Sequence, residues 1–225
     1  MSILKRRLEE VFHIGHGFGA NRVGGTPEED EACELAVSWM EEAGLEVEVD
    51  QRENVVGRLR GTAPELPEVW TGSHLDSVPE GGRFDGALGV AAGLEAVQAV
   101  GRSERTVGVV VFRDEETGCH GSRWRVRHGS LPGSFVEAHI EQGPRLEQAG
   151  APLGVVTSIA GIVRCSRDFE GRADHAGTTP MESRTDALVA AAEYVLRVRD
   201  APAGLDCAVA TVGQREEMDL AVVST

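Results

Sequence analysis

Apolar residues recur at helical spacing over residues 28–43, a pattern that predicts an amphipathic helix. Thr26 is a favourable N-cap, Pro27 suits the first helical position, and Glu29 completes a capping box. Gly44 follows as a residue suited to ending a helix. Both ends of this predicted helix are therefore marked in the sequence.

Several runs of β-branched or alternating apolar residues predict strands. The run at 106–112 (TVGVVVF) is almost continuously apolar, which is typical of a strand buried on both faces. A helix rich in glycine and alanine is predicted before it, at 86–100. The other predicted strands are 45–49, 54–59, 68–72, 135–140 and 153–159. Because strands and helices interleave, we expect an α/β sheet with helices on both sides.

The order of elements changes after about Gly161, where a second domain is expected to begin. The pattern there predicts a strand, a helix and a strand, at 162–170, 185–199 and 206–212. We therefore divide the chain into a first domain of residues 1–161 and a second of residues 162–225.

The charge of the chain limits its partners. Of 225 residues, 22 are basic and 37 are acidic, giving a formal net charge of −15 at pH 7. A field of this sign repels phosphates and anionic membranes, so we expect neither nucleic acid nor membrane as a partner. No apolar run reaches the roughly 18 residues of a membrane helix, and the charged start MSILKRRLEE is unlike a signal peptide. We expect a cytoplasmic protein.

Chemically reactive side chains follow the ends of successive predicted strands. They are His74, Asp76, Asp85, Glu115, Glu116 and His139. The carboxyl ends of strands in an α/β sheet form the crevice that binds ligands, so we expect these side chains to converge. So many carboxylates in one place are costly unless a cation neutralises them. Imidazole nitrogens mixed with carboxylate oxygens suit zinc, manganese or cobalt, which favours a divalent-metal centre.

The spacing also suggests individual roles. Asp76 follows His74 closely enough to hold the far nitrogen of its ring, and the two oxygens of Asp85 can bridge two ions. Glu115 and Glu116 are adjacent, so in extended backbone one can bind metal while the other faces substrate as a proton carrier. The alternative is structural: a single histidine is commonly a core or surface residue, and paired glutamates are commonly solvated.

Five motifs resemble, in order, those of one family. They are GSHLDSV (72–78), FDG (84–86), DEE (114–116), AHIEQGP (138–144) and ADHAGTTPM (173–181). Together they resemble the hydantoinase/carbamoylase amidases of the M20 metallopeptidase superfamily. That group includes N-carbamoyl-L-amino-acid hydrolases, allantoate amidohydrolases and β-ureidopropionases. The resemblance implies an α/β, mixed-sheet catalytic domain and the first part of an inserted α+β lid domain that mediates dimerisation.

The resemblance also implies a site that holds two divalent ions. His74, Asp85 and His139 resemble the ligands of one ion, with Asp85 bridging to the second. Glu116 resembles a ligand of the second ion, and Glu115 resembles the general base that acts on metal-bound water.

The implied activity is metal-dependent hydrolysis of linear amide or ureido C–N bonds in small molecules. N-carbamoyl amino acids or allantoate-type compounds are the expected substrates. Gln142 resembles a substrate-binding residue, and His175 resembles the lid histidine that helps to polarise the scissile carbonyl, often across a homodimer. A turn residue before Gly177 is the alternative interpretation of His175.

The chain departs from the family pattern in two ways. The stretch between DEE and HIEQGP is short, and residues 117–123 (TGCHGSR) are closer to the superfamily's peptidases. No histidine follows His175 to complete the second metal site. The last residue of this sequence is Thr225, and we expect it to lie within the lid domain. Three interpretations stay open: a truncated amidohydrolase, an M20-type aminoacylase or dipeptidase, and an inactive fragment or pseudoenzyme that retains metal or dimer binding.

Overall fold

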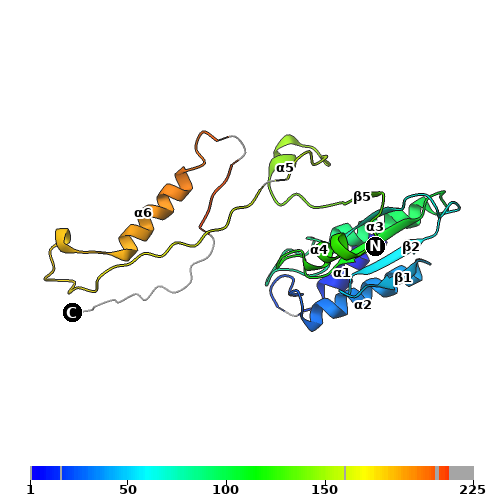
Figure 1. The fold of residues 1–225 in the computed structure, drawn as a ribbon, viewed down its shortest axis with the longest axis horizontal. Coiled ribbons are helices and arrows are strands. Elements are labelled where there is room, and N and C mark those ends of the chain that lie inside the picture. Colours follow the sequence, from blue (N-terminus) through cyan, green and yellow to red (C-terminus); the bar gives the residue numbers. More distant parts are fainter. Residues whose placement is uncertain (1, 16, 160, 206–207, 213–225) are drawn as a thin grey trace. The chain divides into compact units, whose positions relative to one another are not determined.

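The computed structural model describes residues 2–15, 17–159, 161–205 and 208–212. The chain divides into two units, Met1–Gly154 and Val155–Thr225, whose course is coloured along the sequence in Figure 1. The expected domain boundary near Gly161 lies a few residues beyond this division. The assignment of the two parts as catalytic and lid domains stays a prediction.

A five-stranded mixed sheet forms the centre of the first unit. Its strands are β1 (Glu46–Val49), β2 (Val55–Leu59), β3 (Val69–His74), β4 (Val107–Phe112) and β5 (Ser134–Val136), in the spatial order β1-β2-β4-β3-β5. β3 runs parallel to β4 and β5, whereas β2 runs antiparallel to β1 and β4. The predicted α/β class, with a mixed sheet, is confirmed.

The central strand β4 is buried on both faces, as its continuous apolar run predicts. Val109 and Val111 belong to the larger core. Val110 lies on the opposite face, where it packs with Val56 and Trp70. Because successive strand residues point to opposite sides, an unbroken run of valines supplies both cores at once.

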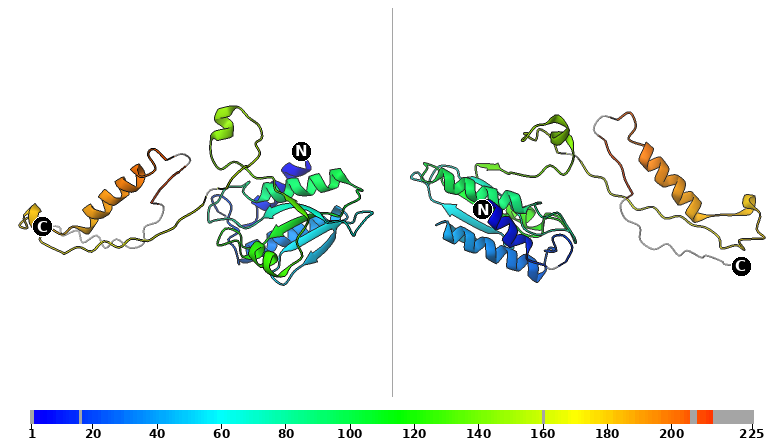
Figure 2. Two further views of the ribbon diagram at one scale, coloured as in Figure 1. Left: turned by 45° about the horizontal axis from the view of Figure 1, so that its top comes forward. Right: turned by 180° about the vertical axis from the view of Figure 1, so that it is seen from behind.

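α2 and α3 pack directly on this sheet (Figures 1 and 2). The helices of the first unit are α1 (Ile3–Phe12), α2 (Pro27–Glu42), α3 (Ala87–Val100), α4 (His120–His128) and the short α5 (Arg145–Ala149), which buries no side chain. α2 contacts β1 and β2, α3 contacts β3 and β4, and α1 packs on α3. α2 and α3 confirm the helices predicted from periodicity. Throughout the described ranges, each helix is too short or too polar to cross a bilayer.

Helices α1 and α4 were not predicted. α1 does bury apolar residues, Leu8 and Val11, in the core, whereas the buried face of α4 is not apolar. α4 buries only Gly121 and Arg125. The Arg125 guanidinium lies over the Trp70 ring, 5.2 Å from its centroid, and its Nη1 donates to Asp50 Oδ2 at 3.2 Å. An arginine that packs its planar group on an aromatic ring replaces the leucine that a hydrophobic stripe would show.

The predicted capping box of α2 is wrong. Thr26 is the N-cap in extended conformation, but its side chain makes no capping hydrogen bond. Glu29 instead accepts hydrogen bonds from the N–H groups of Gly25 and Asp114, both at 2.7 Å. The buried carboxylate therefore binds the loop after β4 and does not bond to the N–H of the N-cap residue Thr26.

Over its described residues, the second unit contains one α-helix, α6 (Ala187–Asp200), and a 3-10 turn before it at Met181–Ser183. Asp186 caps α6 by accepting hydrogen bonds from the N–H groups of Leu188 and Val189. The helix predicted at 185–199 is therefore confirmed. None of the side chains described in this unit is buried.

The strands predicted from 153 onwards are wrong over the described residues. Residues 153–159, 161–170 and 208–212 carry no strand, and 206–207 lie outside the described residues. The strand predicted at 135–140 ends at Val136. A β-branched run needs a neighbouring strand for its backbone groups, and no described segment of the second unit pairs with these runs. Val155 and Val163 are accordingly 91% and 92% exposed.

Candidate metal centre

Three parallel strands bring the predicted residues to one edge of the sheet. His74 is the last residue of β3 and is paired in register with Phe112, the last residue of β4. β5 runs parallel to β3 on its other side and leads to His139. Because the carboxyl ends of parallel strands meet at the same edge, segments far apart in the chain converge there.

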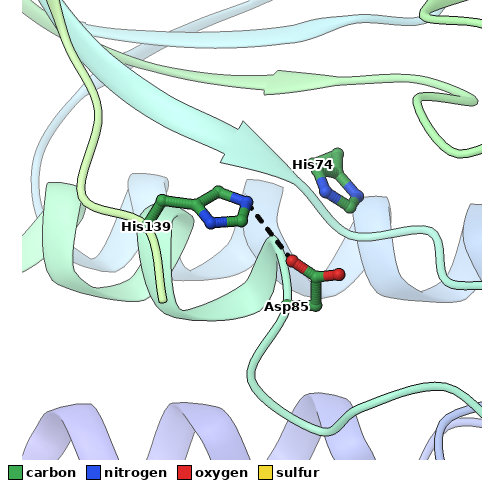
Figure 3. Close-up of side chains that lie close together, drawn as sticks. All are labelled: His74, Asp85 and His139. Carbon is green, nitrogen blue, oxygen red and sulfur yellow. Dashed lines mark ion pairs between the residues drawn. The ribbon is translucent and has the colours of Figure 1, made fainter. Parts of the chain in front are cut away.

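His74, Asp85 and His139 form a compact group at this edge (Figure 3). One ligand atom from each residue lies within 4.8 Å of the others. Nε2 of His139 lies 3.3 Å from Oδ1 of Asp85. His74 is buried, Asp85 is half-buried and His139 is exposed, so the group opens toward solvent.

This group is suited to a divalent cation. Oδ1 of Asp85 is buried and accepts no hydrogen bond, whereas Oδ2 accepts one from Nε2 of Gln142 at 2.7 Å. A buried carboxylate oxygen without a donor is unfavourable, and a cation would satisfy it. Two imidazoles and one carboxylate are the mixed donors that zinc, manganese and cobalt accept.

The His74 ring is fixed from several sides. Its Nδ1 lies 3.2 Å from Oδ1 of Asp76 and 3.1 Å from the Asp76 carbonyl oxygen. Its Nε2 lies 3.8 Å from Oε2 of Glu115. A Cβ at Gly86 would lie 2.7 Å from the ring, and Gly86 has a φ of 62°, so a glycine is required there.

Electrostatics give the ion-free His74 ring a strong affinity for a proton. Burial by itself lowers the pKa of His74, but the hydrogen bond and charge of Asp76 and the charges of Glu115 and Glu116 outweigh it. The pKa is raised to about 9. A cation that binds the ring must displace this proton, as expected for a histidine ligand.

Asp76 connects the loops that follow β3 and β4. Its side chain is fully buried, and Oδ2 accepts the N–H of Glu116 at 2.9 Å. Burial alone raises the pKa of Asp76, yet the hydrogen bonds from His74 and from main-chain N–H groups hold it below its ordinary value. Asp76 is thus an ionised group that orients both the His74 ring and the Glu116 backbone.

Glu115 and Glu116 lie in a turn before α4, not in the extended backbone that was expected. The Glu115 side chain is 38% exposed at the mouth of the group. Glu116 is half-buried, and burial together with the charges of Asp85, Glu115 and Asp76 raises its pKa above the ordinary value, against the lowering effect of His74. Among the described residues, Glu116 is not part of the His74–Asp85–His139 group.

The two predicted substrate contacts occupy different positions. Gln142 donates to Asp85, so it contacts the His74–Asp85–His139 group directly. His175 belongs to the second unit, where its Nδ1 accepts hydrogen bonds from the N–H groups of Gly177 and Thr178 at 3.0 and 3.2 Å. Within its own unit His175 therefore holds a turn.

Sequence reasoning missed the residues that support the loop after β4. Nη2 of Arg113 lies 3.1 Å from Oε2 of Glu29, and the Arg113 N–H donates to Oδ1 of Asn54 at 3.0 Å. One signal was available in the sequence. Glu29 falls on the same helix face as the buried Cys33 and Ala36, and a glutamate on an apolar face indicates a buried polar contact.

The fold and this edge define an α/β protein with a histidine and carboxylate group suited to a divalent ion. Residues 70–214 match the peptidase family M20/M25/M40, and the chain belongs to this family. The family resemblance seen in the motifs is thereby confirmed.

Curated relatives and solved structures agree with this assignment. An N-carbamoyl-L-amino acid amidohydrolase of Geobacillus stearothermophilus is 37% identical to this chain over an alignment of 260 positions. The alignment covers 94% of this chain and 63% of the relative. Allantoate deiminase 1 of Glycine max is 35% identical over 244 residues, covering 84% and 50%. A crystal structure of a hydantoinase/carbamoylase family amidase from Burkholderia ambifaria superposes with a TM-score of 0.69 at 30% identity, covering 94% and 63%. The chain thus spans between half and two thirds of the length of these relatives.

Proposed function

We propose that this chain provides the metal-binding part of a metal-dependent hydrolase of linear amide or ureido C–N bonds. Small N-carbamoyl amino acids or allantoate-type compounds are the proposed substrates. The proposal depends mainly on one observation: His74, Asp85 and His139 converge at the strand ends of an M20-family fold. Relatives named for carbamoyl and allantoate chemistry support the substrate class.

In this proposal His74, Asp85 and His139 hold one ion of zinc, manganese or cobalt. Glu116 and Asp85 would hold a second ion. The pKa of Glu116 is raised by burial and by the charges of neighbouring carboxylates, which a cation would offset. A bound divalent ion supplies an acidified water and a positive charge for the carbonyl oxygen. The buried Oδ1 of Asp85, which accepts no hydrogen bond and lies 3.3 Å from Nε2 of His139, supports the place of Asp85 as a ligand.

Glu115 is the proposed general base. Its exposed carboxylate at the mouth of the group takes a proton from the attacking water and returns it to the leaving nitrogen, so the C–N bond breaks without releasing an amide anion. Asp76 keeps the proton of His74 on Nδ1, which leaves Nε2 free to act as a ligand. The turn that carries Glu115 gives its side chain access to solvent and substrate.

Gln142 and His175 are the proposed substrate contacts. Gln142 donates to Asp85 in the described structure, and its amide becomes free for substrate once a cation occupies that carboxylate. His175 is proposed to contact the scissile carbonyl from the lid of a cytoplasmic homodimer. Both assignments stand on the family motifs HIEQGP and ADHAGTTPM.

A titration with Mn²⁺, Co²⁺ or Zn²⁺, followed by assays on N-carbamoyl, N-acyl and dipeptide substrates, tests the proposal. We expect saturable ion binding and turnover of a carbamoyl substrate, with both lost in His139→Asn. His128→Asn is the matched control, because that exposed ring stacks on Trp124 away from the group. Preference for acyl or peptidyl substrates would replace the carbamoylase assignment with an aminoacylase or dipeptidase. Binding of one ion without any turnover would indicate a non-catalytic protein.

A further inference from the structure

Glu29 is a buried carboxylate in the first turn of α2, and its partners belong to the loops around the metal centre. Its side chain is 1% exposed. Oε2 accepts the Gly25 N–H and Oε1 accepts the Asp114 N–H, both at 2.7 Å. Nη2 of Arg113 lies 3.1 Å from Oε2. One side chain thus ties the start of α2 to two consecutive residues after β4.

The burial of such a group is unfavourable unless it is fully paired. Burial raises the pKa of Glu29, while the hydrogen bonds from Gly25 and Asp114 and the charge of Arg113 act in the opposite direction. A helix end exposed to water would not need this arrangement, because an exposed Ser or Asp caps a helix at less cost. The partners of Glu29 therefore point to the loop after β4, not to helix capping.

The same loop is confined from a second direction by Gly24. A Cβ at Gly24 would collide with Oδ1 of Asp114 and lie 2.9 Å from its Cγ. Asp114 itself adopts a left-handed backbone with φ 52°, which glycine adopts freely and aspartate only occasionally. This conformation turns the chain directly before Glu115 and Glu116. It is held within the loop by Thr117 and the His120 N–H, which donate to Asp114, and from outside the loop by Glu29.

We propose that Glu29 is a positioning residue that fixes the Asp114–Glu116 loop and so places the carboxylates of Glu115 and Glu116 at the metal centre. The inference rests on the proposed function for the roles of those two carboxylates. It assigns to the segment GGTPEE, residues 24–29, a part in the site that the family motifs do not include. Glu29 acts through the backbone of the loop and touches neither ion nor substrate.

Glu29→Gln, compared with Glu31→Gln, tests this role. Glu31 lies on the same helix but is exposed, so the chemical change is identical while the loop contact is absent. Amide hydrogen exchange of the intact 225-residue chain is followed in peptides that contain Asp114. We expect protection there to fall at least about tenfold in Glu29→Gln and to stay unchanged in Glu31→Gln.

A second measurement separates positioning from general support of the fold. For Glu29→Gln we expect kcat on a carbamoyl substrate to fall by about ten- to a hundredfold while KM and the Mn²⁺ affinity of the His74–Asp85–His139 group stay unchanged. Unchanged exchange at Asp114, or equally faster exchange throughout the first unit, overturns the proposal. If the wild-type chain neither binds Mn²⁺ nor turns over substrate, the proposed function fails, and the exchange experiment still decides whether Glu29 holds the loop.

Gly24→Ala provides an independent test should Glu29→Gln not fold. Its new methyl group would press on Asp114 independently of Glu29, so we expect the same local loss of protection. Gly82→Ala is the control, because a Cβ there meets no atom within 4 Å. Equal protection of Asp114 in these two variants would contradict a tightly confined loop.

Discussion

The end of β3 and the segment that follows β5 contribute to the same group but are held very differently. At the end of β3 the His74 side chain is 6% exposed, and the neighbouring Asp76 is fully buried. β5 has only three residues, and Phe135 and Val136 within it are exposed. His139, which follows it, has a side chain 38% exposed.

The difference shows that the core holds the end of β3 with His74, which we call the buried half, whereas few buried contacts hold the segment after β5 with His139, which we call the exposed half. The buried half has its ring orientation and proton position set before any ion arrives. The exposed half has a histidine that contacts Asp85 across an open edge. An ion that joins the two halves would therefore order the β5 segment more than the β3 segment.

The largest effect should come from Glu115, which follows β4 and whose Oε2 lies 3.8 Å from Nε2 of the buried His74 ring. Glu115→Gln keeps the size of the side chain but removes the proton acceptor, so kcat should fall by about 10²- to 10⁴-fold. Ion content, measured by atomic absorption after dialysis, should not change. A parallel loss of bound ion would show that Glu115 is a ligand and not the base.

The next effect concerns the ion-free protein and pH. The pKa of His74 is raised to about 9, so its protonated ring stabilises the fold fully below its ordinary pKa, and this contribution is lost as pH rises through about 9. The free energy of unfolding should fall by on the order of 3 kcal/mol from pH 6 to pH 10 in the presence of a chelator. Urea unfolding of His74→Asn should lack this component, and an equal pH dependence in that variant would exclude His74 as its origin.

A smaller effect separates the two halves in ion binding. Asp76→Asn weakens the hydrogen bond that orients His74 and should lower ion affinity by about ten- to a hundredfold. Gln142→Ala removes an amide that competes for Asp85, so affinity should stay the same or rise slightly. Calorimetric titration with Zn²⁺ measures both, and a larger loss in Gln142→Ala would reverse the contrast between the halves.

The smallest effect is on stability. Gly86→Ala forces a methyl group against the His74 ring at a left-handed backbone position, and should lower the free energy of unfolding by about 1–3 kcal/mol. Gly143→Ala in the β5 half meets only the Glu141 side chain at 3.7 Å and should change it by less than about 0.5 kcal/mol. Thermal unfolding of both variants checks the difference, and equal losses would contradict it.

Much of the site could be predicted from where side chains stand relative to strand ends. His74 ends β3 and His139 follows β5, so the parallel pairing of these two strands brings the histidines to one edge, and Asp85 joins them from the turn before α3. Glu29 could not be placed in this way. Its partners Gly25 and Asp114 come from a near and a distant loop, and only the packing of α2 on the sheet decides which of them it meets.

The predicted strands of the second unit show where prediction from local side-chain pattern fails. The runs around Val155 and Val163 have suitable side chains for strands, but a strand forms only where another backbone offers its N–H and C=O groups. Helix α6 needs no such partner, because its hydrogen bonds are internal and Asp186 supplies its cap. Local pattern therefore predicted the helix correctly and the strands incorrectly.

The parallel pairing of β3 with β4 also bears on when the site comes into being. The pairing joins Val69 to Val107, with the whole of α3 lying between them in the chain. Contacts of this separation form late in folding, because the intervening loop must close before any pair is made. During synthesis His74 leaves the ribosome well before Glu115, and His139 follows later still. The proposed ligands are therefore separated in a nascent chain, and the proposed ion site would form only once the sheet is complete.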